Sequence, residues 1–79
     1  MATTTLGVPG ELRIVWGSNL RAARLRAGFS SQGELAAALG CTRQAVSNWE
    51  RGVSAPSHTL RVEIARVLHR SPSRLFPAA

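Results

Sequence analysis

Apolar residues recur at steps of three and four along the first third of the chain, which is the spacing of one face of a helix. The pattern predicts a helix over Glu11–Ala27, whose apolar face is formed by Leu12, Val15, Trp16, Leu20, Ala23 and Ala27. Gly17 lies inside this pattern and should weaken the helix by about 1 kcal/mol relative to alanine. A start near Ser18 is therefore also open, whereas Gly28 predicts the end of the helix.

A capping box, Ser31-Gln32-Gly33-Glu34, predicts where a second helix begins. In such a box the serine oxygen accepts from a free backbone amide while the glutamate reaches back to the cap. Gly40 predicts the end of this helix. A helix this short is not stable alone and needs tertiary partners, for which its apolar face offers Leu35, Ala36 and Leu39.

A third helix is predicted over about Arg43–Arg51, with Thr42 as its N-cap and Gly52 after its end. Val46 and Trp49 are three residues apart and are expected to face the core. Trp49 could also stack on a nucleic-acid base, but its place on the inward face favours a core role. The opposite face carries Arg43, Gln44, Ser47, Asn48 and Arg51.

Two further serines predict the starts of the remaining helices. Ser57 caps a helix over His58–Leu68, and Ser71 with Pro72 starts a short helix over about Pro72–Phe76. No stretch has a strand pattern and no segment repeats. The sequence therefore predicts an all-α, five-helix domain over residues 11–79, preceded by a flexible arm over residues 1–10, which has no apolar periodicity.

The second and third helices and the turn between them have the spacing of a helix-turn-helix unit. Such a unit needs a small residue where the helices cross, a glycine in the turn, and apolar residues that hold the two helices at a fixed angle. Ala36 and Gly40 meet the first two needs, and the apolar positions are Cys41, Val46 and Trp49.

With these residues the chain resembles the Cro and phage-repressor class of helix-turn-helix proteins, also called the xenobiotic-response-element class. Three stretches carry the likeness, Leu20–Phe29, Ser31–Gly40 and Thr42–Gly52, and it continues through Pro56-Ser57 to Leu75-Phe76. It covers about 57 of the 79 residues. The resemblance implies a compact lambda-repressor-like domain that binds the major groove of double-stranded DNA.

The resemblance also implies roles for individual residues. Gln32 lies where the family uses a glutamine to bond a phosphate and brace the recognition helix. Arg43 and Gln44 occupy the usual base-reading positions, and Ser47 and Asn48 follow one turn later. Side-chain chemistry agrees, because arginine pairs with guanine O6 and N7 and glutamine with adenine N6 and N7. We expect Arg43 to read a guanine and Gln44 to read an adenine or contact a phosphate; a solvated helix face is the alternative.

Phosphate contacts are expected at helix ends, where free amides and cationic side chains attract anions. The candidates besides Gln32 are Thr42, Arg51 and Ser57, for which a solvated surface is the alternative reading. The resemblance further implies an ion pair between Arg24 and Glu50 that fixes the third helix to the first. Losing one partner of such a buried pair costs about 3–5 kcal/mol.

Charge supports a nucleic-acid partner without proving one. The chain has ten arginines, no lysine, four glutamates and no aspartate, which gives a net charge of +6. Such a domain attracts polyanions, either nucleic acid or an acidic membrane surface. Arginine suits the fork-shaped recognition of phosphate and guanine, although a GC-rich genome would also explain the absence of lysine.

Other functional classes find little support in the residues. No apolar run is long enough to span a membrane, and Cys41 is the single cysteine, so no internal disulfide forms. His58 and His69 are too far apart for a metal site with that cysteine, and no nucleophile–base arrangement occurs. We therefore expect no catalysis, cofactor, metal or small-molecule ligand, and a cytoplasmic protein in a reducing compartment.

The function expected is transcriptional regulation, in the first place repression, by a homodimer on a near-palindromic operator. Its contact surface is predicted at Leu75, Phe76 and Pro77, with Trp16 as a further candidate, although these residues could instead close the core of a monomer. Three alternatives stay open: an antitoxin, a controller of a restriction system, and a protein-interaction module with this fold. A peripheral membrane binder would need an apolar face that folding does not use.

Overall fold

The computed structural model describes residues 8–78, which contain five helices and no strand. The helices are α1 (Gly10–Arg26), α2 (Gln32–Leu39), α3 (Arg43–Glu50), α4 (His58–Leu68) and α5 (Pro72–Leu75). The all-α, five-helix fold predicted from the sequence is confirmed. Most of the predicted N-terminal arm lies outside the described residues; of its last three, Val8 is half-buried and packs against the core.

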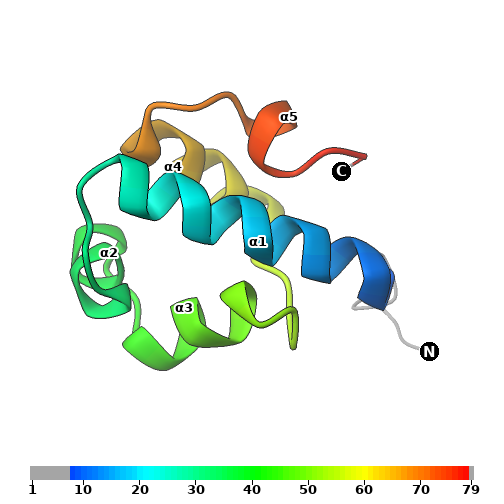
Figure 1. The fold of residues 1–79 in the computed structure, drawn as a ribbon, viewed down its shortest axis with the longest axis horizontal. Helices are drawn as coiled ribbons and strands as arrows, with labels where there is room; N and C mark the ends of the chain where they lie inside the picture. The colour runs from blue at the N-terminus through cyan, green and yellow to red at the C-terminus, as the bar shows by residue number, and fades with distance from the viewer. Residues whose placement is uncertain (1–7, 79) are drawn as a thin grey trace.

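The long helix α1 runs through the middle of the molecule (Figure 1). The helix α3 lies along one side of it, α4 and α5 lie on the other side, and α2 closes the end near the C-terminus of α1. The five largest fully buried side chains come from α1, α2, α3, α4 and the residue after α5: Leu20, Leu35, Val46, Ile64 and Phe76. Every helix therefore contributes to one shared core.

Three of the helices begin at the N-cap residues predicted from the sequence, Ser31, Thr42 and Ser57. Ser31 accepts from the amide of Glu34, whose carboxylate bonds back to the amide of Ser31, so the capping box is complete. Thr42 and Ser57 likewise accept from backbone amides in the first turns of α3 and α4. Ser71 is the exception, because its side chain makes no cap hydrogen bond and α5 begins on Pro72 alone.

The alternative start of the first helix near Ser18 is wrong. The helix α1 begins at Gly10 and passes without a break through Gly17, which is buried. A Cβ on Gly17 would lie 2.5 Å from the backbone oxygens of Trp49 and Glu50. The glycine therefore allows the end of α3 to approach α1 more closely than any side chain would, a gain that its low helix propensity does not reveal.

Three of the four residues predicted as a dimer contact close the core of the monomer instead, whereas Pro77 is half-buried. Trp16, Leu75 and Phe76 are each at most 3% exposed. The rings of Trp16 and Phe76 meet edge to face, with 5.3 Å between their centroids, and the Trp16 indole donates to the Pro77 carbonyl at 2.8 Å. Since these three side chains are used within the fold, they are not available to a second copy.

Candidate nucleic-acid interface

The turn between α2 and α3 positions the start of the candidate recognition helix. Gly40 has a φ of 72°, in the left-handed region that favours glycine. This conformation lets the Cys41 amide bond back to the Ala36 carbonyl at 3.0 Å, which ends α2. Two residues later the Thr42 hydroxyl accepts from the Ala45 amide at 3.1 Å and starts α3. The turn between the two helices thus spans the three residues Gly40, Cys41 and Thr42.

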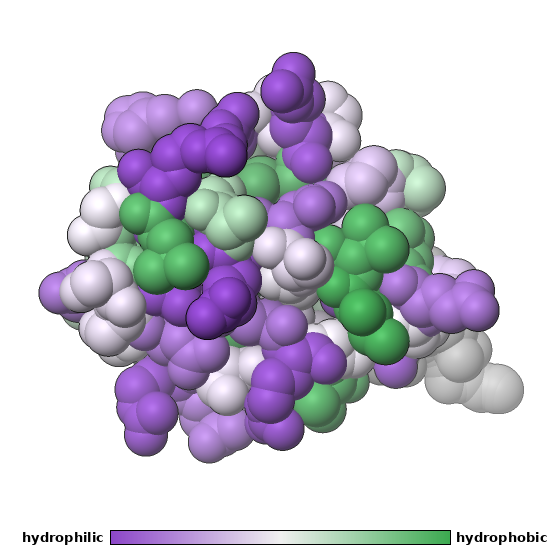
Figure 2. Space-filling view, viewed as in Figure 1, coloured by the Kyte–Doolittle hydropathy of each residue, from purple (hydrophilic) through white to green (hydrophobic). Residues whose placement is uncertain are grey.

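The helix α3 has one packed face and one open face. Val46 is completely buried and Trp49 is 6% exposed; the inward role predicted for both is confirmed. On the opposite face Arg43 and Gln44 are exposed, and Ser47 and Asn48 are half-buried. Figure 2 shows mostly hydrophilic residues over α3, along the lower edge of the view. This face therefore offers polar groups to a partner.

Four side chains of the open face are joined by hydrogen bonds. The Asn48 Oδ1 atom accepts from Gln44 Nε2 at 3.0 Å and from Arg51 Nη2 at 2.8 Å. Arg51 Nε also donates to the Ser47 hydroxyl at 3.3 Å. The structure therefore brings three of the predicted base readers together with Arg51, which the sequence assigned to phosphate.

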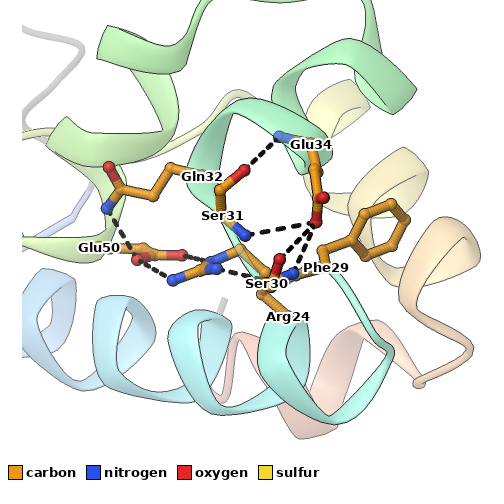
Figure 3. Close-up of polar contacts among 7 residues, drawn as sticks. All are labelled: Arg24, Phe29, Ser30, Ser31, Gln32, Glu34 and Glu50. Carbon is orange, nitrogen blue, oxygen red and sulfur yellow. Dashed lines mark hydrogen bonds and ion pairs between the residues drawn. The ribbon is translucent and has the colours of Figure 1, made fainter.

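The back of α3 is attached to α1 by a buried ion pair. Arg24 Nε lies 2.7 Å from Glu50 Oε2, and the side chains are 6% and 3% exposed. Figure 3 shows two further partners: Gln32 Nε2 donates to Glu50 Oε1 at 2.9 Å, and Arg24 Nη1 donates to the Phe29 carbonyl at 2.8 Å. We refer to Arg24, Glu50, Gln32 and the Phe29 carbonyl as the Glu50 cluster.

The Glu50 cluster gives Gln32 a partner that the sequence did not predict. The amide nitrogen of Gln32 points to the carboxylate of Glu50, so Gln32 braces α3 from inside the domain. One of its two amide hydrogens remains for a phosphate. Chain position alone could not show this contact, because the two residues are 18 positions apart and lie on different helices.

A second attachment, also missed from the sequence, lies just beyond the end of α3. Arg13 Nε donates to the Gly52 carbonyl at 3.0 Å, and its Nη1 donates to the Val8 carbonyl at 2.8 Å. Together with the close approach at Gly17, this bond ties α1 to the segment that follows Trp49. No sequence signal pointed to the Arg13 hydrogen bond. Gly17 was the one sequence signal that α1 approaches another element closely, because a glycine inside a helix usually has a packing reason.

Two hydroxyl groups predicted to contact phosphate lie at helix starts. Thr42 and Ser57 are exposed, and their oxygens accept from the amides of Ala45 and Leu60 at 3.1 and 3.3 Å. A hydroxyl that accepts in this way still has a hydrogen to donate. The helix ends therefore retain donors that suit an anion.

Few acidic groups offset the arginines. Among residues 8–78 there are two ion pairs, Arg24–Glu50 and Arg66–Glu63, so Arg43 and Arg51 have no carboxylate partner there. A hydrogen bond from the Ser30 hydroxyl, helped by the amides of Ser31 and Ser30, lowers the pKa of Glu34 and keeps it ionised in its capping role. Burial raises the pKa of the Cys41 thiol, as expected for a packed turn residue.

The described part of the chain has neither a candidate metal site nor a candidate membrane span. Across residues 8–78 no three His, Cys, Asp or Glu side chains are grouped so that they could hold a metal ion. Over the same residues none of the helices has both the length and the apolar character needed to cross a membrane.

Comparisons with known proteins agree with the geometry. A family model described as helix-turn-helix matches residues 20–75. The crystal structure of the restriction-modification controller protein C.AhdI from Aeromonas hydrophila superposes with a TM-score of 0.77 at 31% sequence identity, covering 85% of this chain and 96% of that one. No curated protein matches the chain.

Proposed function

This chain belongs to the Cro/C1-type helix-turn-helix family, and from that membership we propose that it represses transcription by occupying a near-palindromic operator. Sequence-specific DNA binding and transcription regulation come with the family. The observation that carries the proposal is the division of α3 into a packed face, Val46 and Trp49, and an open face of hydrogen-bonding side chains. Repression then follows from blocking a promoter, with no catalytic step, in the cytoplasm where the DNA lies.

In the proposed complex the open face of α3 lies in the major groove. Arg43 reads a guanine through O6 and N7, and Gln44, Ser47 and Asn48 reach the neighbouring base edges. Support comes from the exposure of these side chains: Arg43 and Gln44 are exposed and Ser47 and Asn48 are half-buried, whereas Val46 is completely buried. Each good bidentate contact discriminates against a wrong base by about 1–3 kcal/mol.

Phosphate contacts would fix the register of the protein on the duplex. We assign them to Thr42 and Ser57, whose hydroxyl hydrogens are available, and to Arg51 and the remaining amide hydrogen of Gln32. For each phosphate neutralised, the slope of log affinity against log salt should steepen by about 0.9. The salt dependence therefore reports the phosphates that arginines neutralise, to which Arg51 contributes and the neutral side chains of Thr42, Ser57 and Gln32 do not.

A controller of a restriction-modification system is the second candidate. C.AhdI is such a controller by its printed name, and this chain covers 96% of it. That observation favours the controller role over the antitoxin and protein-interaction alternatives. A reporter gene placed behind the selected operator distinguishes the two forms of regulation: repression lowers its expression at every protein level, whereas a controller that also activates raises it over part of the range.

Selection of bound sequences from random double-stranded DNA, repeated at two salt concentrations, tests the proposal. We expect a sharp near-palindrome whose half-sites are about 34 Å apart, and an affinity that falls steeply with salt. Arg26→Ala is the matched control, because it removes one charge from the exposed end of α1 and leaves α3 unchanged. Weak binding without a motif would overturn the proposal and favour a protein-interaction module.

We propose a homodimer on the operator, because a two-fold dimer presents two recognition helices to successive major grooves. The contact must use surface other than Trp16, Leu75 and Phe76, which are buried in the monomer. Sedimentation at micromolar concentration, with and without operator DNA, measures the state. Protein that stays monomeric on a palindromic operator would exclude the dimer.

A further inference from the structure

The hydrogen bonds on the open face of α3 form one connected chain, which passes from Gln44 to Asn48, Arg51 and Ser47. Two donors, Gln44 Nε2 and Arg51 Nη2, converge on Asn48 Oδ1 at 3.0 and 2.8 Å. A carbonyl oxygen has two lone pairs, so both acceptor positions of Asn48 are occupied. Asn48 therefore cannot use this oxygen for a base while the chain of bonds is intact.

This chain has a direction that Arg51 determines. A guanidinium group has donors and no acceptor, so only the oxygen of Asn48 can face Arg51. With that oxygen fixed, Gln44 must turn its nitrogen toward it. If the Asn48 amide alone were reversed, both hydrogen bonds would be lost, because its Nδ2 donor would then face the donors Gln44 Nε2 and Arg51 Nη2.

The result is a fixed pattern of groups that point away from the chain of bonds. Asn48 presents its Nδ2 hydrogens, and Ser47 presents its hydroxyl hydrogen because its oxygen accepts from Arg51 Nε at 3.3 Å. Gln44 presents its Oε1 acceptor together with the second hydrogen of its Nε2. In the major groove, an amide donor suits guanine O6 and N7, adenine N7 or thymine O4, whereas an acceptor suits adenine N6 or cytosine N4.

We infer that Arg51 is a specificity-determining residue that acts through Asn48 and Gln44, by fixing which end of each amide faces the DNA. The inference rests on the proposed function and adds to it that Asn48 acts only as a donor, to guanine, thymine or adenine N7 and not to cytosine, whereas Gln44 keeps an acceptor for adenine or cytosine. A pairing of Asn48 with adenine through both amide atoms is excluded while Arg51 occupies its oxygen.

The test compares the operator motifs selected by the wild type, Arg51→Ala and Arg51→Lys. Selections with Gln44→Ala and Asn48→Ala first identify the base pairs that these residues read. In Arg51→Ala the preference at those base pairs should fall by about tenfold, the discrimination that roughly one amide contact supplies, while the base pair read by Arg43 keeps its preference. The lysine ammonium also donates to Asn48 Oδ1, so Arg51→Lys should retain most of the preference.

The same experiment separates a positioning role from a phosphate role. If Arg51→Ala keeps every base preference and only reduces the salt slope by about 0.9, the phosphate contact assigned above is the whole role of Arg51 and the inference is wrong. If the wild type selects no motif, the proposed function fails and the inference falls with it. The melting temperature of Arg51→Ala should match that of the wild type, because Arg51 is exposed and its loss leaves no buried group unpaired. If Arg51→Ala instead loses preference equally at all base pairs and melts at a lower temperature, the role of Arg51 is merely structural and the inference is wrong.

Discussion

Replacing Gly17 by alanine should destabilise the protein, although helix propensity alone predicts the opposite. In an isolated helix this change stabilises by about 1 kcal/mol, because glycine loses more backbone entropy on folding. Here the new Cβ would lie 2.5 Å from the Trp49 and Glu50 carbonyl oxygens and 2.9 Å from the carbonyl carbon of Glu50. All three atoms belong to the backbone, so no flexible side chain can move aside.

The size of the effect follows from the distance that must be gained. Ordinary contact begins at 3.4 Å, so the end of α3 would have to move by about 0.9 Å. That movement would stretch the 2.7 Å ion pair of the Glu50 cluster, which joins the same two helices. Overpacking of this kind costs about 1–3 kcal/mol, and with rigid backbone on both sides we expect the upper part of that range. After the gain in helix propensity, Gly17→Ala should lose about 1–2 kcal/mol net.

Thermal and urea unfolding measure this directly. For a domain of this size each kcal/mol corresponds to about 4–8 °C in melting temperature. Gly33→Ala is the matched control, because a Cβ at that helical glycine would meet nothing closer than 3.7 Å and should leave stability equal or slightly higher. A Gly17→Ala protein at least as stable as the wild type would refute the reasoning, since it would mean that α3 does not need to lie this close to α1.

Three other changes test the interface and its supports. Arg43→Ala should relax the preference at one base pair of the selected operator, and an unchanged motif would refute that assignment. Glu50→Ala should lower the free energy of unfolding by about 3–5 kcal/mol, since it leaves Arg24 buried without a counter-ion, and an unaltered melting temperature would contradict this. Glu34 has a lowered pKa when folded, so its contribution to stability is present above the ordinary value of 4.5 and is lost as the pH falls through the folded pKa. The stability of Glu34→Gln should therefore approach that of the wild type in acid, whereas a constant difference would exclude this linkage.

The sequence predicted helix boundaries well because their causes are local. Ser31, Thr42 and Ser57 start helices through bonds to amides three residues ahead. Gly40 ends α2 through its own backbone conformation. Each of these features depends on a few neighbouring residues and on backbone chemistry that is the same in any fold.

The sequence could not decide which surface covers an apolar face. The pattern around Trp16 predicts an apolar side of a helix, and that side would look the same against another helix or against a second molecule. Its partners, Phe76 and the Pro77 carbonyl, come from the far end of the chain, and the indole bond joins residues 61 positions apart. Only the folded arrangement assigns these residues to the core rather than to a dimer contact.

The C-terminal end of the recognition helix is held by three attachments to α1 and its partners. Gly17 allows α1 to approach the backbone of Trp49 and Glu50 closely. The Glu50 cluster holds the side chain of Glu50, and Arg13 donates to the Gly52 carbonyl. All three attachments come from α1 or from residues that bond to it, and apart from Gln32 none of them has been assigned a contact with DNA. Because base contacts require hydrogen-bond distances of about 2.7–3.2 Å, a shift of α3 by even 1 Å would disturb several of them at once. Substitutions at Arg13, Gly17 or Arg24 should therefore weaken operator binding across all base pairs, whereas substitutions on the open face of α3 should change the preference at individual ones.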